Sequence, residues 1–246
     1  GKAGWLEVTK EDGYYDASIL WGGGSVVPVD SVVFSDDNTL LVTRTRDVKR
    51  EGPNGKVVRT QRFTDLITAK INGDDMRLTL THPNFNGKGL ENSDFTGKRI
   101  PPIPAKPNLK KVKYGKPIAL FNGKNLDQWE LLDSTKPNGW SVSGKTLSND
   151  PVQEEGKPHL RYGNLRTKAT FEDFNLKLEV KVPKGGNSGI YLRGIYEIQV
   201  AATYGKPLDS HNMGGIYSRV VPAMAAEKPA GQWQTYDITL VDWHVT

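Results

Sequence analysis

Short runs of β-branched and aromatic residues recur along the first hundred residues, and turn-forming residues separate them. Runs of this length, bounded by Gly, Asn, Asp or Pro, are typical of strands. They comprise Trp5 to Thr9, Tyr15 to Trp21, Val26 to Phe34, Thr39 to Arg46, Lys56 to Ile71 and Met76 to Thr81. The pairs Asn54-Gly55 and Asn72-Gly73 predict hairpins, because glycine accepts the positive φ of hairpin turns. We therefore expect residues 1–96 to form a small antiparallel β-barrel or half-barrel.

The second half of the chain also carries the two-residue period of strands. Between Phe174 and Val182 the even positions are apolar and the odd positions polar, which predicts one buried face and one wet face. Tyr236 to Leu240 repeats the pattern, with Asp237 and Thr239 opposite the apolar face. Because no segment has helical length and period, the predicted class is all-β.

Residues 97–116 differ in composition from the segments on either side, since prolines and basic residues dominate them. Proline fixes φ and cannot donate a hydrogen bond to a sheet. We therefore predict an extended linker between a domain of residues 1–96 and a second domain of residues 117–246.

The composition excludes several classes of protein. The chain has 246 residues, a net charge of +5 and no cysteine, so disulfides, thiolate nucleophiles and iron–sulfur clusters are excluded. No apolar run approaches the roughly 20 residues of a membrane helix. Much of the positive charge lies around the linker, and no strand interleaves basic with aromatic residues as single-strand binders do. Nucleic acid is therefore not an expected partner.

The segment from Asn187 to Val200 carries the most informative group of polar residues. If it is one continuous strand, one face presents an aromatic ring, a cation, a carboxylate and an amide, with alternate residues about 7 Å apart. These residues are Tyr191, Arg193, Glu197 and Gln199. Such a set suits a sugar, because the ring can stack on it while the polar groups bond its hydroxyls. The alternative is a surface ion pair between Arg193 and Glu197 without functional meaning.

Two further residues are candidates for contacts with a ligand. His211 lies in a long polar loop, the kind of segment that often carries binding residues. Asp237 lies on the polar face of its predicted strand. None of the four histidines shows the His-Glu-x-x-His spacing of a zinc protease.

Five ordered segments of the second half resemble the 3-keto-disaccharide hydrolase family, a group of glycosyl hydrolases. They are Phe121 to Trp129, Asn187 to Gly194, Tyr196 to Val200, Gly214 to Tyr217 and Lys228 to Ile238. The resemblance covers residues 117–246 and implies a concanavalin-A-like jelly-roll sandwich with a concave sugar-binding face. It also implies a glycoside or disaccharide substrate oxidised at C3 of the sugar, and export to the periplasm or cell surface, although the chain shows no signal peptide.

The implied reaction is an elimination followed by hydration. A 3-keto group acidifies the C2 hydrogen, so a base can remove it, the C1 substituent leaves, and water then adds to complete a net hydrolysis. On this resemblance we expect Glu197 to act as the base or as a metal ligand, and Arg193 to stabilise the enolate charge. A divalent metal ion could supply that stabilisation instead. The expected substrate-binding residues are Gln199, Tyr191, Asp237 and His211.

The chain departs from the family pattern in two places. Ala201-Ala202 follow the Glu-x-Gln-Val segment, where family members often carry an acid, and Asp209 with His211 is a possible replacement. The chain also stops at Thr246 in what its pattern predicts to be mid-strand, so we expect the second domain to be incomplete at its C-terminus. A non-catalytic carbohydrate-binding module is the alternative function, because jelly rolls serve both roles. An adhesion or scaffold protein is a third possibility.

Overall fold

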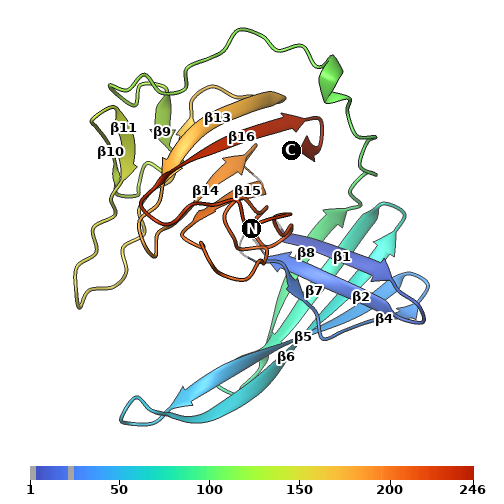
Figure 1. Cartoon of the computed structure of the whole chain (residues 1–246). Helices are drawn as coiled ribbons and strands as arrows, with labels where there is room; N and C mark the ends of the chain where they lie inside the picture. The colour runs from blue at the N-terminus through green and yellow to red at the C-terminus, as the bar shows by residue number, and fades with distance from the viewer. Residues whose placement is uncertain (1–3, 22–24, 195) are drawn as a thin grey trace. The chain divides into compact units, whose positions relative to one another are not determined.

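The computed structural model describes residues 4–21, 25–194 and 196–246. Within these ranges the chain is built from strands, and the helical element is the short 3₁₀ helix η1 (Leu109–Lys111) (Figure 1). The predicted all-β class is confirmed, with several antiparallel sheets consistent with a β-sandwich. Across the described ranges, no helix has the length and apolar character needed to cross a membrane.

Residues 4–98 form two antiparallel sheets. The first has the order β1 (Gly4–Lys10), β2 (Tyr15–Trp21) and β3 (Val27–Pro28). The second has five strands in chain order, and these are β4 (Ser31–Asp36), β5 (Thr39–Glu51), β6 (Val57–Asn72), β7 (Asp75–Pro83) and β8 (Leu90–Lys98). Each strand of the larger sheet pairs with its neighbour in sequence, as the hairpin signals predict.

The two Asn-Gly pairs lie in the turns that they predict. Asn72 pairs with Asp75 at the end of the β6–β7 ladder, and Gly73 takes a φ of 59° between them. Gly55 takes a φ of 67° in the turn that joins β5 to β6. A residue with a Cβ rarely adopts these angles, so glycine permits both turns to be short.

The core of this half lies where β4–β7 meet β2. Its residues alternate with exposed ones along each strand, as expected for sheets with one covered face. The buried set is Ala17, Ile19, Val32, Leu40, Val42, Ile67, Ala69 and Leu78. Val42 and Ile67 are each 0% exposed and pair across β5 and β6, so they form the centre of this core.

Most strands of the second half are shorter than those of the first, and they form several small sheets. Two-stranded sheets join β9 (Trp129–Leu131) to β12 (Leu165–Thr167) and β10 (Trp140–Ser143) to β11 (Thr146–Asn149). A third joins β14 (Asn187–Leu192) to β15 (Tyr196–Ala201). A three-stranded sheet has the order β13 (Phe174–Lys181), β16 (Trp233–Val241) and β17 (His244–Val245).

The alternation predicted for β16 is confirmed in the structure. Ile238 and Leu240 are each 5% exposed, whereas Asp237 lies on the opposite, exposed face. The chain groups into two compact units, one of residues 1–103 and 180–234 and the other of residues 104–179 and 235–246. The predicted division into residues 1–96, 97–116 and 117–246 stays a prediction, since the compact units cut across it.

Candidate functional site

The segment from Asn187 to Val200 is a hairpin and not the continuous strand that its period suggests. Strand β14 ends at Leu192 and β15 begins at Tyr196. Between them, Arg193 and Gly194 take φ values of 51° and 70°. Two consecutive residues with positive φ reverse the chain, so the assumption of one strand is wrong. Tyr191 and Glu197 consequently face each other across the hairpin instead of lying three alternate positions apart along a strand.

Glu197 and Tyr191 form a hydrogen-bonded pair on this hairpin. The two residues are cross-strand partners, and the Tyr191 side chain is hydrogen-bonded to that of Glu197. The Glu197 side chain lies over Gly189, because a Cβ built on Gly189 would approach its Cγ and Cδ to 2.5 Å. The absence of a side chain at position 189 therefore makes the space that Glu197 occupies.

The Tyr191 phenol remains protonated far into the alkaline range. Desolvation, as the largest cause, together with the hydrogen bond and the negative charge of Glu197, raises the pKa of Tyr191 to about 12. The positive charge of Arg219 acts in the opposite direction. Tyr191 is nevertheless 55% exposed. The pair thus presents a proton donor and a carboxylate side by side at an accessible surface.

The loop after β15 brings further polar residues to this pair. The amide of Tyr217 donates to the carbonyl of Glu197 at 2.8 Å. The guanidinium of Arg219 donates to the carbonyl of Tyr217 at 3.2 Å and lies 5.4 Å from the ring centroid of Tyr196. Arg219 is therefore a cation whose charge acts on Tyr191, and Arg193 lies in the hairpin turn.

His211 lies in the same loop and is oriented by two neighbours. Its ring packs edge to face on Tyr217, with centroids 4.9 Å apart and an interplanar angle of 87°. Its Nδ1 lies 3.5 Å from Oδ1 of Asp209, whose carboxylate also accepts the backbone amide of His211 at 2.6 Å. Asp209 and His211 thus form the pair that the sequence suggests as a replacement for the missing acid.

Gln199 lies inside the protein and holds this loop. It is 4% exposed, and its Nε2 donates to the carbonyl of His211 at 3.1 Å. Its backbone also exchanges hydrogen bonds with Gly214 and Gly215. These contacts make Gln199 a positioning residue for the loop, and its substrate-binding role stays a prediction that its burial does not favour.

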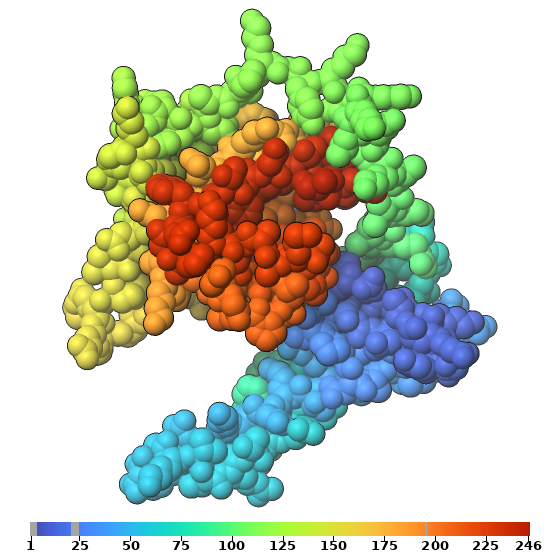
Figure 2. Space-filling model, viewed as in Figure 1, coloured from blue at the N-terminus to red at the C-terminus, as the bar shows by residue number. Residues whose placement is uncertain are grey.

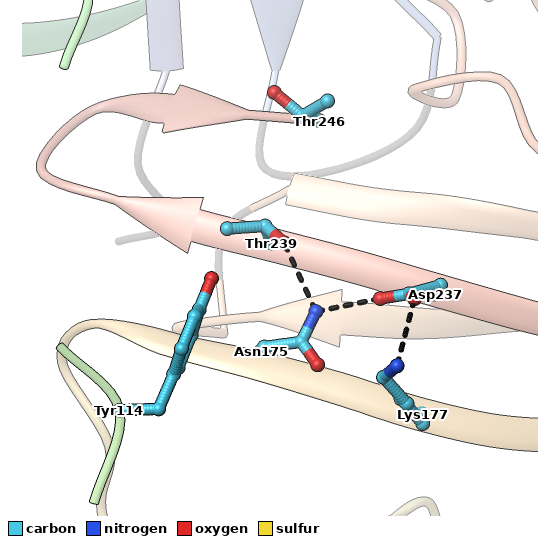
Figure 3. Close-up of a pocket in the computed structure, with 6 residues that line it drawn as sticks. All are labelled: Tyr114, Asn175, Lys177, Asp237, Thr239 and Thr246. Atoms are coloured by element: carbon cyan, nitrogen blue, oxygen red, sulfur yellow. Dashed lines mark hydrogen bonds and ion pairs between the residues drawn. The ribbon is translucent and has the colours of Figure 1, made fainter. Parts of the chain in front are cut away.

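Asp237 belongs to the other compact unit, where it lies in a groove on the polar face of β13 and β16 (Figure 3). The Asn175 amide donates to Oδ1 of Asp237 at 2.6 Å and to the Thr239 hydroxyl at 3.0 Å. The Lys177 ammonium lies 3.1 Å from Oδ2 of Asp237. These bonds fix the carboxylate, and they lower the pKa of Asp237, with the Asn175 amide as the largest cause and Lys177 next.

Tyr114 forms one wall of this groove, which has a volume of about 480 Å³. Its ring stands beside the polar cluster in Figure 3 and is 59% exposed. An aromatic ring next to fixed donors and acceptors is a combination suited to a sugar, which has both C–H faces and hydroxyls. Tyr114 comes from the proline-rich and lysine-rich stretch, and its sequence position gave no sign of this role.

The structure therefore brings together only part of the predicted set. Tyr191 and Glu197 form a pair, His211 belongs to the loop beside it, Gln199 of β15 holds that loop, and Asp237 lies in a separate cluster. Sequence reasoning missed Tyr217, Arg219 and Tyr114. The Gly-Gly-Ile-Tyr segment could have indicated Tyr217, which it contains. No motif or spacing in the sequence indicated Arg219 or Tyr114.

The residues do not outline a metal site. Among residues 4–21, 25–194 and 196–246, no group of three or more histidine, aspartate or glutamate side chains is placed to hold a metal ion. Asp209 and His211 supply two potential ligands only.

Comparison with known proteins places the site in a recognised domain. Neither a curated protein nor a solved structure matches the chain. The family model of the 3-keto-alpha-glucoside-1,2-lyase-like domain matches residues 116–246, more than half of the sequence. This range contains the Tyr191–Glu197 pair, the loop that carries His211 and Arg219, and Asp237. The chain therefore belongs to the family of the 3-keto-alpha-glucoside-1,2-lyase-like domain.

Proposed function

We propose that the protein cleaves glycosides whose sugar is oxidised at C3, by elimination across C1 and C2. The observation that carries this proposal is the hydrogen-bonded Tyr191–Glu197 pair on an accessible hairpin of the family domain. An elimination needs a base and an acid close together, and this pair supplies both. The name of the family, a 1,2-lyase acting on a 3-keto-alpha-glucoside, supports the same bond positions.

Glu197 is the proposed base in the first step. Its carboxylate takes the proton from C2, the electron pair of the C2–H bond forms the C1–C2 double bond, and the C1–O bond breaks. Tyr191 donates its proton to the departing oxygen, so an alcohol leaves and an unsaturated 3-keto sugar remains. Addition of water, with OH to C1 and H to C2, then gives the free 3-keto sugar. Because the pKa of Tyr191 lies well above neutrality, its phenol carries the proton at neutral pH.

Negative charge develops on the 3-keto oxygen as the C2 proton leaves, and a cation placed there would lower the barrier. Arg219 supports this role because its charge already acts on Tyr191. Arg193, the cation that the sequence favours for the role, lies in the adjacent turn and stays a second candidate. Glu197 could alternatively be a residue of a site that binds sugar without cleaving it.

The groove around Asp237 and Tyr114 supports that second function, a carbohydrate-binding module. The groove can hold a sugar through its fixed hydrogen-bond acceptors and its exposed tyrosine ring, and this binding does not require a catalytic base. The two functions make different predictions for Glu197→Gln, a change that keeps the shape of the side chain and removes its basicity. In an enzyme, Glu197→Gln abolishes turnover but leaves sugar binding. In a carbohydrate-binding module, the same change leaves the affinity for sugar unchanged, and there is no turnover to lose.

The direct test compares p-nitrophenyl 3-keto-α-glucoside with p-nitrophenyl α-glucoside. We expect release of p-nitrophenol from the 3-keto substrate only, and in D2O we expect deuterium at C2 of the product above the level in an enzyme-free blank. Glu197→Gln should abolish both signals, whereas Glu179→Gln, the same change at an exposed position of β13, should leave them unchanged. A parallel reaction with a chelator asks whether a metal ion contributes.

Two results would overturn the proposal. Equal cleavage of the unoxidised glucoside, without deuterium at C2, would require a hydrolysis with two carboxylates instead of an elimination. Full activity of Glu197→Gln on the 3-keto substrate would remove Glu197 from the mechanism. Binding of a sugar without cleavage of either substrate would favour the carbohydrate-binding module.

A further inference from the structure

The distal parts of β5 and β6 form a two-stranded ribbon that no other strand extends. Strand β4 pairs with β5 only as far as Thr43, and β7 pairs with β6 only from Leu66. Residues 44–65 therefore pair with one another alone, from Arg44 opposite Asp65 to Glu51 opposite Val57. Figure 1 shows this part of β5 and β6 running on past the other strands of their sheet, and in Figure 2 it stands out from the body of the sheet. We call residues 44–65 the ribbon.

The ribbon carries a clear excess of basic over acidic residues. Its seven basic residues are Arg44, Arg46, Lys49, Arg50, Lys56, Arg59 and Arg62, and its three acidic residues are Asp47, Glu51 and Asp65. The ribbon thus has a net charge of +4, against +5 for all 246 residues. A concentration of one sign on a protruding element produces a field that attracts polyanions.

Some of these charges are used inside the ribbon. Arg46 pairs with the buried Asp65 at 2.8 Å, and Arg62 pairs with Asp47 at 2.9 Å. The exposed Lys49, Lys56 and Arg59 have no acidic partner within ion-pair distance among the residues that the structure describes. The last two lie in or beside the turn at the tip, next to Val58, which is 69% exposed. These three cations are available to a ligand.

Fold stability does not account for this arrangement. Charged residues, lysine above all, keep the open edges of a ribbon from pairing with other chains, but that role needs only scattered charges and not an excess of one sign. The core of the sheet ends at Val42 and Ile67, so the ribbon buries little of its own apolar surface. A two-stranded ribbon is only marginally stable, and the excess of one sign adds repulsion, as where Arg50 lies directly opposite Arg59.

We propose that the ribbon binds an anionic polysaccharide, a sugar chain with repeating carboxylate or sulfate groups. Lys49 pairs with Thr60 and Arg50 with Arg59, so the side chains of Lys49 and Arg59 lie on opposite faces of the ribbon, and Lys56 lies in the turn between its strands. Cations on both faces of a protruding tip suit a long polymer with repeating charges, which can contact more than one side of it. The family domain of residues 116–246 is named for a sugar substrate, so a polysaccharide is the polyanion that we favour as a ligand of the ribbon. This inference goes beyond the proposed function, because binding at the ribbon needs no cleavage at Glu197.

Nucleic acid fits the ribbon less well. Proteins that bind single strands offer open aromatic faces on which bases stack. Here the two phenylalanine rings at the ribbon each carry a guanidinium over one face, Arg46 on Phe85 at 5.0 Å and Arg50 on Phe63 at 5.6 Å. The rings also pack edge to face with each other at 5.2 Å. The ribbon offers charge, but each of the two rings has one face covered by a guanidinium and also packs on the other ring.

The test measures binding of the full chain by calorimetry at low ionic strength. The probes are polygalacturonate for carboxylate, dextran sulfate for sulfate, neutral dextran as a blank and duplex DNA as the competing polyanion. We expect one or both acidic polysaccharides to bind, and the binding to weaken as salt is added. The triple variant Lys49→Glu, Lys56→Glu, Arg59→Glu should weaken binding on the order of a hundredfold.

A matched control changes the same net charge elsewhere. Lys106→Glu, Lys110→Glu and Lys111→Glu alter three exposed lysines of the proline-rich and lysine-rich stretch and should leave binding within about threefold. A milder ribbon variant, with Gln at the three positions, should give an intermediate loss if the Glu variant folds poorly. The proposal is overturned if neither acidic polysaccharide binds, if the control variant weakens binding as much as the ribbon variant, or if duplex DNA binds more tightly than both.

Discussion

The side chain of Glu197 lies directly over the Cα of Gly189, its diagonal neighbour in the β14–β15 hairpin. A methyl group at position 189 would approach the Glu197 Cγ and Cδ to 2.5 Å, so Gly189→Ala must push the carboxylate aside. Displacement of a reacting group by about 1 Å costs on the order of a hundredfold in rate. We therefore expect Gly189→Ala to lower kcat on the 3-keto substrate by about that factor, as measured by release of p-nitrophenol.

The same substitution should have little effect on stability. Alanine has less conformational freedom than glycine in the unfolded chain, and this difference stabilises the folded state by about 0.4–1 kcal/mol. The carboxylate that alanine displaces is at the flexible end of its side chain, so moving it costs little. The free energy of unfolding should thus change by less than about 1 kcal/mol in urea titrations. Ser188→Ala, at the exposed neighbouring position, is the control and should keep full activity. Unchanged kcat in Gly189→Ala would contradict the assigned position of Glu197.

Tyr191 should titrate apart from the other tyrosines. Because its pKa is raised to about 12, we expect a difference titration of the wild type against Tyr191→Phe to show one phenol ionising near that pH. In Glu197→Gln the midpoint should fall, but it should stay above 10.0 because desolvation is the largest cause of the shift. Absorbance of tyrosinate measures both midpoints. A single phenol with an ordinary midpoint would contradict the hydrogen bond with Glu197.

The raised pKa of Tyr191 also predicts how the free energy of unfolding depends on pH. Between about pH 10 and 12 the folded protein keeps the Tyr191 proton that the unfolded chain loses, so the free energy of unfolding falls as the pH rises through this window. Below pH 10 both states hold the proton and the contribution is constant. Tyr191→Phe removes the group, and its stability should fall less steeply over this window. Urea titrations of both proteins at several alkaline pH values measure the difference.

Most strands could be predicted from the sequence, because their residues alternate and their turns carry glycine. Gly73 marks the β6–β7 turn plainly, and the buried Ile238 and Leu240 follow from the period of β16. The break at Arg193 could not be predicted, since arginine has no preference for positive φ and the apolar period continues on both sides of the turn. Only Gly194 hinted at it.

The candidate site was harder to predict, because a period of two assigns residues to faces but does not say what covers each face. Gln199 shares a face with Glu197 by period, yet the loop of residues 209–219 buries it. The loop has no period of its own, so nothing in the sequence placed Arg219 beside Tyr191. Tyr114 was hidden for a related reason, since composition predicted only an extended linker at that position.

The groove on β13 and β16 should contribute to binding and not to chemistry. Tyr114→Ala removes one wall of the groove, and loss of a stacking contact of about 1 kcal/mol would raise the Kd for a glucoside, measured by calorimetry, about fivefold. Tyr14→Ala changes a tyrosine of similar exposure, 62% against 59%, outside this groove and should have no effect. An unchanged Kd in Tyr114→Ala would contradict a binding role.

Asp237→Asn should weaken binding to the same extent at pH 5 and at pH 8. The Asn175 amide and Lys177 lower the pKa of Asp237 below its ordinary value, so the carboxylate is ionised at both pH values. Because the ion pair with Lys177 is exposed, its loss should change the free energy of unfolding by no more than about 1 kcal/mol. Calorimetric titration with the 3-keto glucoside at the two pH values measures the first expectation. A loss that appears only at pH 8 would show that another group titrates.

Ile67→Ala should destabilise the five-stranded sheet far more than Val58→Ala at the tip of the ribbon. Ile67 is 0% exposed and packs at the centre of the core with Val42, so the substitution leaves a cavity that its neighbours cannot fill. Such changes cost about 2–5 kcal/mol. Val58→Ala, at a ribbon residue that is 69% exposed, removes a side chain that makes no core contact and should cost less than about 0.5 kcal/mol. Urea titrations compare the two, and similar losses would mean that the ribbon packs against something and is not free to bind a polysaccharide.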